Sequence, residues 1–103
     1  MKVSIIIPTF NESKTIIKIL KEVNAQRNQE TTFEVIVVND GSTDHTHKLI
    51  TENIQLVDKY ICLETNSGKG AAVKEGLLQA SGDYILFPDA DLEYSPSDYN
   101  KFF

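Results

Sequence analysis

Asp89 and Asp91 are two carboxylates separated by a single residue, and Glu93 follows them. Acidic side chains at this spacing could bind a cation. Carboxylates this close repel each other unless a cation lies between them or one is protonated. All-oxygen ligands of this kind suit Mg²⁺ or Mn²⁺, ions that usually also hold substrate phosphates. The alternative is a solvated acidic turn, because Asp is common in turns. We therefore treat these three acids as candidate metal ligands.

An apolar run directly precedes these acids. Tyr84–Phe87 is bounded by Gly82-Asp83 and by Pro88, which predicts a short buried strand. The acids would then follow the carboxyl end of a strand, where open α/β sheets place their ligand sites.

Three more apolar runs predict strands, and segments with helical spacing separate the four strands. The other predicted strands are Val3–Ile7, Phe33–Val38 and Lys59–Leu63. The predicted helices carry, in order, Ile16, Leu20 and Val23, then Leu49 and Ile50, then Val73, Gly76, Leu77 and Ala80. We expect Ser42 or Thr43 to cap the second helix, and Ser95-Pro96-Ser97-Asp98 to begin a fourth. This alternation predicts the α/β class, with about four parallel strands and helices on both faces.

Composition is that of an ordinary soluble globular protein. The chain has 103 residues, 41% hydrophobic and 24% charged, which predicts a single domain over residues 1–103. A net charge of −5 argues against a nucleic-acid-binding protein, which would carry a basic stripe. Cys62 is the single cysteine and lies in an apolar run, so we expect a buried structural thiol. The apolar start is too short for a signal peptide or membrane span, so we expect a cytoplasmic protein, with peripheral membrane attachment as an option.

Polar or glycine-rich residues follow every predicted strand. These segments are Pro8–Glu12, Asn39–Asp44, Asn66–Gly70 and Asp89–Asp91. Each one alone is explained by a turn, because Asn, Asp, Gly and Ser favour turns. The carboxyl ends of parallel strands lie along one edge of a sheet, so the four segments can build a single site.

The same segments resemble the motifs of family 2 glycosyltransferases, whose catalytic domain has the Rossmann-like GT-A fold. The matching residues are Val3–Glu12, Val37–Asp44, Asn66–Val73 and Asp89–Glu93. The last two segments are most similar to the polyprenyl-phosphate or dolichol-phosphate mannose and glucose synthases. The resemblance spans essentially the whole chain but covers only the donor-binding half of the family's catalytic domain.

The resemblance implies how a UDP- or GDP-sugar donor would be bound. It implies that the Asp40 carboxylate accepts an N–H of uracil or guanine. It also implies that Pro8, Thr9 and Glu12 line the same nucleoside pocket. The acceptor that it implies is a polyprenyl phosphate or a glycan.

The resemblance further implies how the diphosphate is held. Asp89 and Asp91 would bind Mg²⁺ or Mn²⁺, and Glu93 would add a metal or water-mediated contact. Lys69, on a glycine-flanked turn before a helix, would contact phosphate, although a solvated lysine is the alternative.

Two departures from the family's pattern affect the expected activity. Asn39 stands where many relatives have Asp, and the family's acceptor region and catalytic base normally follow the position of Phe103. The alternative to a transferase is therefore a donor-binding module without independent turnover, which needs further chain or a partner. Tyr99, Phe102 and Phe103 also fall at helical spacing. Unless that helix folds back onto its own sheet, this aromatic face and an uncovered sheet edge predict a homo-oligomer or a covering partner.

The sequence does not match three other kinds of binding site. Gly68-Lys69-Gly70 follows the third strand and has Val73 at the third glycine position, unlike a dinucleotide-binding fingerprint. The same segment lacks the upstream glycine of a Walker A loop. His45 and His47 lie two apart on a predicted helix and face different directions, which argues against zinc.

Overall fold

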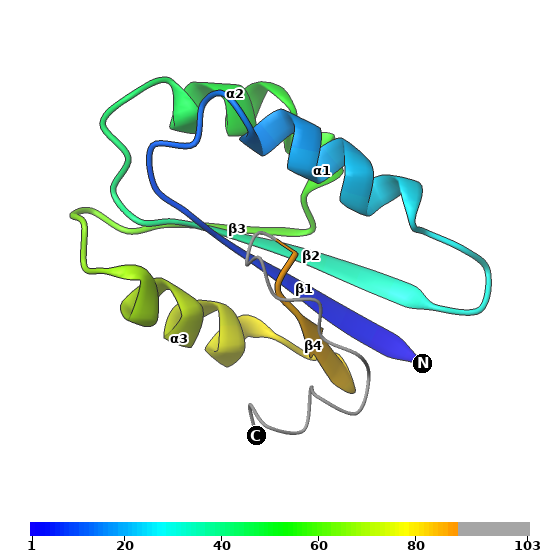
Figure 1. Ribbon diagram of the computed structural model, residues 1–103. Coiled ribbons are helices and arrows are strands. Elements are labelled where there is room, and N and C mark those ends of the chain that lie inside the picture. Colours follow the sequence, from blue (N-terminus) through cyan, green and yellow to red (C-terminus); the bar gives the residue numbers. More distant parts are fainter. Residues whose placement is uncertain (89–103) are drawn as a thin grey trace.

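The computed structural model describes residues 1–88, which alternate between strands and helices (Figure 1). In chain order the elements are β1 (Lys2–Thr9), α1 (Ile16–Ala25), β2 (Thr32–Asn39), α2 (Thr46–Glu52), the 3₁₀ helix η1 (Ile54–Leu56), β3 (Lys59–Cys62), α3 (Lys69–Gln79) and β4 (Tyr84–Leu86). The four predicted strands and the first three predicted helices are all present.

The four strands form one parallel sheet in the order β3-β2-β1-β4. β1 pairs with β2 along its whole length, from Lys2 opposite Thr32 to Thr9 opposite Asn39. On its other side, β1 pairs with β4 through Val3–Ile5. The strand order therefore reverses at β1, because α3 carries the chain back past β1 to β4. Open α/β sheets place ligands at such a switch point, beyond the carboxyl ends of the strands.

Helices cover both faces of the sheet, with α1 and α2 on one face and α3 on the other (Figure 1). Side chains of a strand alternate between faces, so each central strand supplies two cores. The α1 side buries Val3, Ile5, Ile7, Val35 and Val37 with Ile16, Leu20, Val23 and Ile50. The α3 side buries Ile6, Ile36, Val38, Ala72, Ile85 and Phe87. The predicted α/β class, with four parallel strands and helices on both faces, is confirmed.

A buried carboxylate lies near the starts of the strands, on the α3 side. Glu34 is 6% exposed and accepts hydrogen bonds from the Ser4 hydroxyl (3.0 Å) and from the N–H (3.0 Å) and hydroxyl (2.8 Å) of Ser81. It also forms ion pairs with Lys2 (3.3 Å) and Lys59 (3.2 Å). Burial raises the pKa of Glu34, but the bonds from Ser81, Ser4 and Lys59 outweigh it and lower the pKa to about 2. We call this cluster the Glu34 clip, and it consists of Lys2, Ser4, Glu34, Lys59 and Ser81. The clip joins the turn before β4 to the other three strands.

An apolar groove of about 480 Å³ lies on the α1 side of the sheet. It is lined by β1, α1, β4 and the start of β2, and its apolar residues include Val3, Ile5, Ile19, Phe33, Tyr84 and Leu86. Residues 1–88 therefore leave part of this sheet face uncovered.

Two local predictions are wrong. α2 begins at Thr46, so neither Ser42 nor Thr43 caps it, and both of these side chains bond to Asn11 instead. Cys62 is exposed rather than buried. β3 is an edge strand of the sheet, so the residues around it cover it incompletely.

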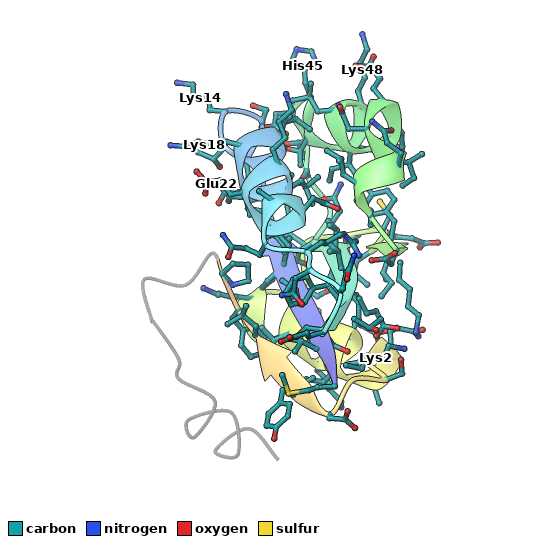
Figure 2. The ribbon with its side chains drawn as sticks, turned by 90° about the vertical axis from the view of Figure 1, so that its right-hand side faces the viewer. Lys2, Lys14, Lys18, Glu22, His45 and Lys48 are labelled. Atoms are coloured by element: carbon teal, nitrogen blue, oxygen red, sulfur yellow. The ribbon has the colours of Figure 1, made fainter. Side chains whose placement is uncertain are left out.

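Several predictions fall outside the described residues. These are the metal ligands Asp89, Asp91 and Glu93, the helix start at Ser95, and the aromatic face of Tyr99, Phe102 and Phe103. Within residues 1–88, no helix is both long and apolar enough to cross a bilayer. Figure 2 shows Lys14, His45 and Lys48 projecting at one end of the molecule and Lys2 lying toward the other.

Candidate functional site

Three loops meet at the carboxyl edge of the sheet, on the left in Figure 1. They follow β1 (residues 10–15), β2 (residues 40–45) and β3 (residues 63–68), and we call them the first, second and third loops. Parallel strands end at the same edge, so the polar segments predicted to share a site are brought together here.

Asn11 joins the first loop to the second. Its backbone φ of +51° lies in the left-handed region, which Asn adopts more readily than most residues. Its Oδ1 accepts from the N–H groups of Thr43 (2.8 Å) and Asp44 (3.3 Å), and its own N–H donates to Ser42 Oγ (3.0 Å). The two loops are therefore held as one unit.

Thr46 makes a second link between the same loops. Its buried hydroxyl accepts from the Glu12 N–H (3.0 Å) and donates to the Asp44 carboxylate. This donated bond is the main reason that the pKa of Asp44 lies below its ordinary value. Asp44 thus stays ionised at neutral pH while it holds the start of α2.

Asp40 joins the second loop to the third. The residue is 3% exposed, and its carboxylate oxygens accept from the N–H groups of Ser67 (2.7 Å) and Gly68 (2.9 Å). The next residue, Gly41, has a φ of +70°, and a Cβ there would lie 2.6 Å from the backbone nitrogen of Asn66. Only glycine fits this turn, because the two loops are in direct backbone contact.

A pocket of about 310 Å³ opens between the three loops. Its lining residues are Pro8, Thr9, Phe10, Glu12, Asp40, Asn66, Gly68, Lys69 and Ala72. The structure thus brings together five of the predicted site residues, namely Pro8, Thr9, Glu12, Asp40 and Lys69. The Thr9 hydroxyl donates its one proton to the Ile7 carbonyl within β1 (3.2 Å), so towards a ligand it can act only as an acceptor.

The first turn of α3 forms one wall of this pocket. Lys69 is the first residue of the helix, and Gly68 before it has a φ of +98°. A helix N-terminus with an adjacent lysine favours an anion. A second hollow of about 390 Å³ shares Pro8, Thr9, Glu12 and Lys69 with the first and extends along α1. The two hollows give room for a ligand that runs from Asp40 past Lys69.

The strand that precedes the predicted metal ligands runs toward the same edge but ends short of it, because Leu86 lies opposite Ile5 and β1 continues to Thr9. β4 ends at Leu86, beside β1, three residues before Asp89. Within residues 1–88, no group of three or more His, Cys, Asp or Glu side chains is placed to hold a metal ion. The acids at 89, 91 and 93 therefore remain the candidate set.

Sequence reasoning missed the parts of the site supplied by Asn11 and Phe10. Asn11 was visible only as a polar residue of the first segment, although Asn after a buried strand is a signal for a left-handed turn. Phe10 is 42% exposed and lines the pocket. In the sequence, a single Phe next to a buried strand gives no signal that separates a pocket residue from a core residue.

Comparison with known proteins gives the family. The model of the family described as Glycosyl transferase family 2 matches residues 4–103. The chain is 34% identical over 101 residues to undecaprenyl-phosphate 4-deoxy-4-formamido-L-arabinose transferase of Proteus mirabilis (strain HI4320), covering 94% of this chain and 31% of the relative. It is 41% identical over 98 residues to dolichyl-phosphate beta-glucosyltransferase ALG5C of Trichomonas vaginalis, covering 84% of this chain and 28% of the relative. The chain spans less than a third of either relative.

Two solved structures have the same fold. TarS of S. aureus in complex with UDP superposes with a TM-score of 0.75 and 40% identity, over 84% of this chain and 26% of that one. The mannosyltransferase PcManGT from Pyrobaculum calidifontis, in complex with GDP-Man and Mn²⁺, superposes with a TM-score of 0.74 and 26% identity, over 84% of this chain and 27% of that one. These neighbours confirm the predicted GT-A fold. Because the family model matches all but the first three residues, the chain belongs to glycosyl transferase family 2.

Proposed function

We propose that this chain binds a sugar linked to UDP or GDP, for transfer of the sugar to an acceptor. The observation that carries the proposal is the convergence of three interlocked loops on one pocket, beside the switch point between β1 and β4. The pocket has a buried carboxylate, Asp40, and a helix N-terminus with Lys69. These groups complement a base and a diphosphate respectively.

Asp40 is the residue to which we assign binding of the nucleobase. Each of its oxygens accepts one backbone hydrogen bond, which leaves lone pairs for an N–H of uracil or guanine. Pro8, Thr9 and Glu12 line the same pocket and would surround the nucleoside. The similarity to TarS, solved with UDP, supports this assignment.

We assign the diphosphate to Lys69, the first turn of α3, and a divalent metal. Asp89, Asp91 and Glu93 would hold that metal, and their oxygens fit Mg²⁺ or Mn²⁺. When bound, the metal would neutralise charge that develops on the leaving nucleoside diphosphate. The similarity to a mannosyltransferase solved with GDP-Man and Mn²⁺ supports the metal.

The acceptor that we propose is a polyprenyl phosphate, with a glycan as the alternative. Both curated relatives named above carry a polyprenyl phosphate in their names, which supports the choice. Such an acceptor is anchored in a bilayer, so we place the chain in the cytoplasm with peripheral attachment to a membrane.

The chain spans less than a third of the two curated relatives named above. The alternative that we propose to a transferase is a donor-binding module that needs further chain or a partner for the acceptor and the catalytic base. We treat residues 1–103 as that single nucleotide-sugar domain. A donor-hydrolysis assay on this polypeptide separates the two functions, because only the transferase releases sugar from the nucleotide.

We also propose that two copies of the chain associate. The apolar groove beside α1 is lined by Ile19, Phe33 and Leu86 among others, and a second copy would cover it.

The test of nucleotide and metal binding is calorimetry with UDP and GDP, each with and without Mg²⁺ or Mn²⁺. We expect binding only with metal, and we expect Asp91→Asn to abolish most of it. Asp83→Asn, an exposed acid at the opposite end of the sheet, is the matched control and should bind as wild type does. Binding that resists a chelator and Asp91→Asn would exclude the metal role. No binding of either nucleotide under any of these conditions would exclude the proposed function.

A further inference from the structure

A series of hydrogen bonds runs from the surface of α2 to the turn that holds Asp40. His47 Nδ1 lies 2.8 Å from the hydroxyl oxygen of Tyr60 on β3, and the two rings stack with centroids 5.7 Å apart. Asn39, the last residue of β2, donates from Nδ2 to the same Tyr60 oxygen (3.0 Å). Asn39 Oδ1 then accepts from the N–H of Ser42 (3.0 Å). Three elements and one loop are thus connected through side chains.

The direction of each bond follows from the backbone N–H of Ser42, which can only donate. The oxygen of the Asn39 amide must face it, so the NH₂ group must face Tyr60. The Tyr60 oxygen therefore accepts from Asn39, and its one proton is directed to His47. Burial raises the pKa of the Tyr60 hydroxyl, so the proton remains there at neutral pH. Tyr60 thus supplies the acceptor that the Asn39 NH₂ group needs in this orientation.

Asn39 is placed where a wrong orientation matters. It is 1% exposed, so an unpaired NH₂ group there is shielded from solvent and costly. Its Oδ1 closes the turn that contains Asp40 and Gly41. At the end of that turn, Ser42 Oγ accepts the N–H of Asn11, which belongs to the first loop. Reversing the amide would set NH₂ against the N–H of Ser42 and open the turn.

We propose that Tyr60 is a positioning residue of the nucleotide site, which holds the Asp40 turn in place by accepting the buried NH₂ group of Asn39 while the Asn39 oxygen bonds to Ser42. Tyr60 is not one of the described residues that line the pocket, so its effect passes through Asn39. The inference rests on the proposed nucleotide-binding function, whereas the support that Tyr60 gives to Asn39 does not. The two are therefore measured separately.

The test uses Tyr60→Phe, which removes one hydroxyl and keeps the ring stacked on His47. In nitrogen-15 NMR spectra without ligand, we expect the Ser42 N–H and the Asn39 NH₂ resonances to move and the Ser81 N–H, at the far end of the sheet, to stay. Calorimetry with UDP and Mn²⁺ should give an affinity about tenfold weaker. His47→Phe is the matched control. His47 is exposed, water can accept the Tyr60 proton there, and affinity should stay within about twofold of wild type.

Each outcome decides the inference. A moved Ser42 resonance with weaker UDP binding supports it. An unmoved Ser42 resonance, or unchanged UDP affinity in Tyr60→Phe, overturns it. An equal loss in His47→Phe also overturns it, because packing of α2 rather than Asn39 would then be responsible. If wild type binds neither UDP nor GDP, the proposed function fails, and the Ser42 resonance alone supports or overturns the role of Tyr60 in holding Asn39.

Discussion

Asp40 combines a structural role with a proposed binding role in one buried carboxylate. Its bonds to the N–H groups of Ser67 and Gly68 hold the third loop beside the second. We propose that the remaining lone pairs accept a hydrogen bond from the nucleobase. A ligand with a base and a ligand without one should therefore respond differently when this carboxylate is removed.

We predict that Asp40→Ala weakens the binding of UDP or GDP by about 1–3 kcal/mol, the usual scale for a hydrogen bond to a charged group. Metal-bound pyrophosphate has no base and should bind almost as it does to wild type. Calorimetry with both ligands measures the difference, and Asp83→Ala is the control for loss of an acid elsewhere. Equal losses for nucleotide and pyrophosphate would show that Asp40 acts only by holding the third loop.

At the scale of elements, α3 lies close to β1 because Gly76 has no side chain. A Cβ at Gly76 would collide with Cγ2 of Ile6. We predict that Gly76→Ala lowers the free energy of unfolding by about 1–3 kcal/mol, since overpacking outweighs the gain in helix propensity. Gly70→Ala on the same helix is the control, because a Cβ there meets nothing within 4 Å. Urea denaturation compares the two, and a Gly76→Ala chain as stable as wild type would mean that Ile6 moves aside freely.

The Glu34 clip predicts how stability depends on pH. The folded-state pKa of Glu34 is lowered from 4.5 to about 2, so its stabilisation is complete above the ordinary value and is lost as pH falls toward 2. The full effect is about 3 kcal/mol. Between pH 5 and pH 2, wild type should therefore lose more unfolding free energy than Glu34→Gln does.

Denaturation curves at several acidic pH values measure this difference. Glu22→Gln is the matched control, because Glu22 is 65% exposed and pairs with Lys18 only at 4.0 Å. It should follow wild type across the whole range. If Glu34→Gln also follows wild type, the clip contributes nothing that depends on its charge.

The sequence was sufficient to predict the kinds of element and their order, because β-branched runs and helical spacing are local signals. It could not predict features that depend on distant partners. Ser42 and Thr43 are good capping residues, but Asn11 occupies their side chains. Cys62 lies in an apolar run that looks buried, and only the position of β3 at the sheet edge makes it exposed.

The candidate site, like the fold, was predictable where local signals decide and not where distant partners do. The polar segments after each strand predicted where the pocket would lie, and Asp40 and Lys69 do line it. The hydrogen bonds that connect the loops were not predictable, because the spacing between Asn11 and Thr43, like that between Asp40 and Ser67, follows no helical or strand period that would mark them as partners. A parallel sheet brings such residues together only after its strands are in register.

At the scale of the whole molecule, we predict that the isolated chain self-associates at micromolar concentration. The reason is the apolar groove beside α1, part of which residues 1–88 leave uncovered. Light scattering should give a mass above that of one chain, and Ile19→Lys, within the groove, should restore the monomer. Ile54→Lys is the matched control, because Ile54 is 46% exposed and is not among the groove residues. A monomeric wild-type chain with one cooperative melting transition would contradict the prediction.

The central position of β1 sets the order in which the fold can be completed. β2 can pair with β1 as soon as α1 has formed, but the other edge of β1 must wait for β4, because Val3 pairs with Tyr84 near the end of the described residues. The Glu34 clip must wait as well, since Ser81 lies in the same late segment. Pairing between distant strands is slow, because the entropy of closing the chain is lost before any contact compensates for it. During that interval an apolar strand has an open edge, so the yield of refolding should fall with protein concentration even where the finished fold is stable.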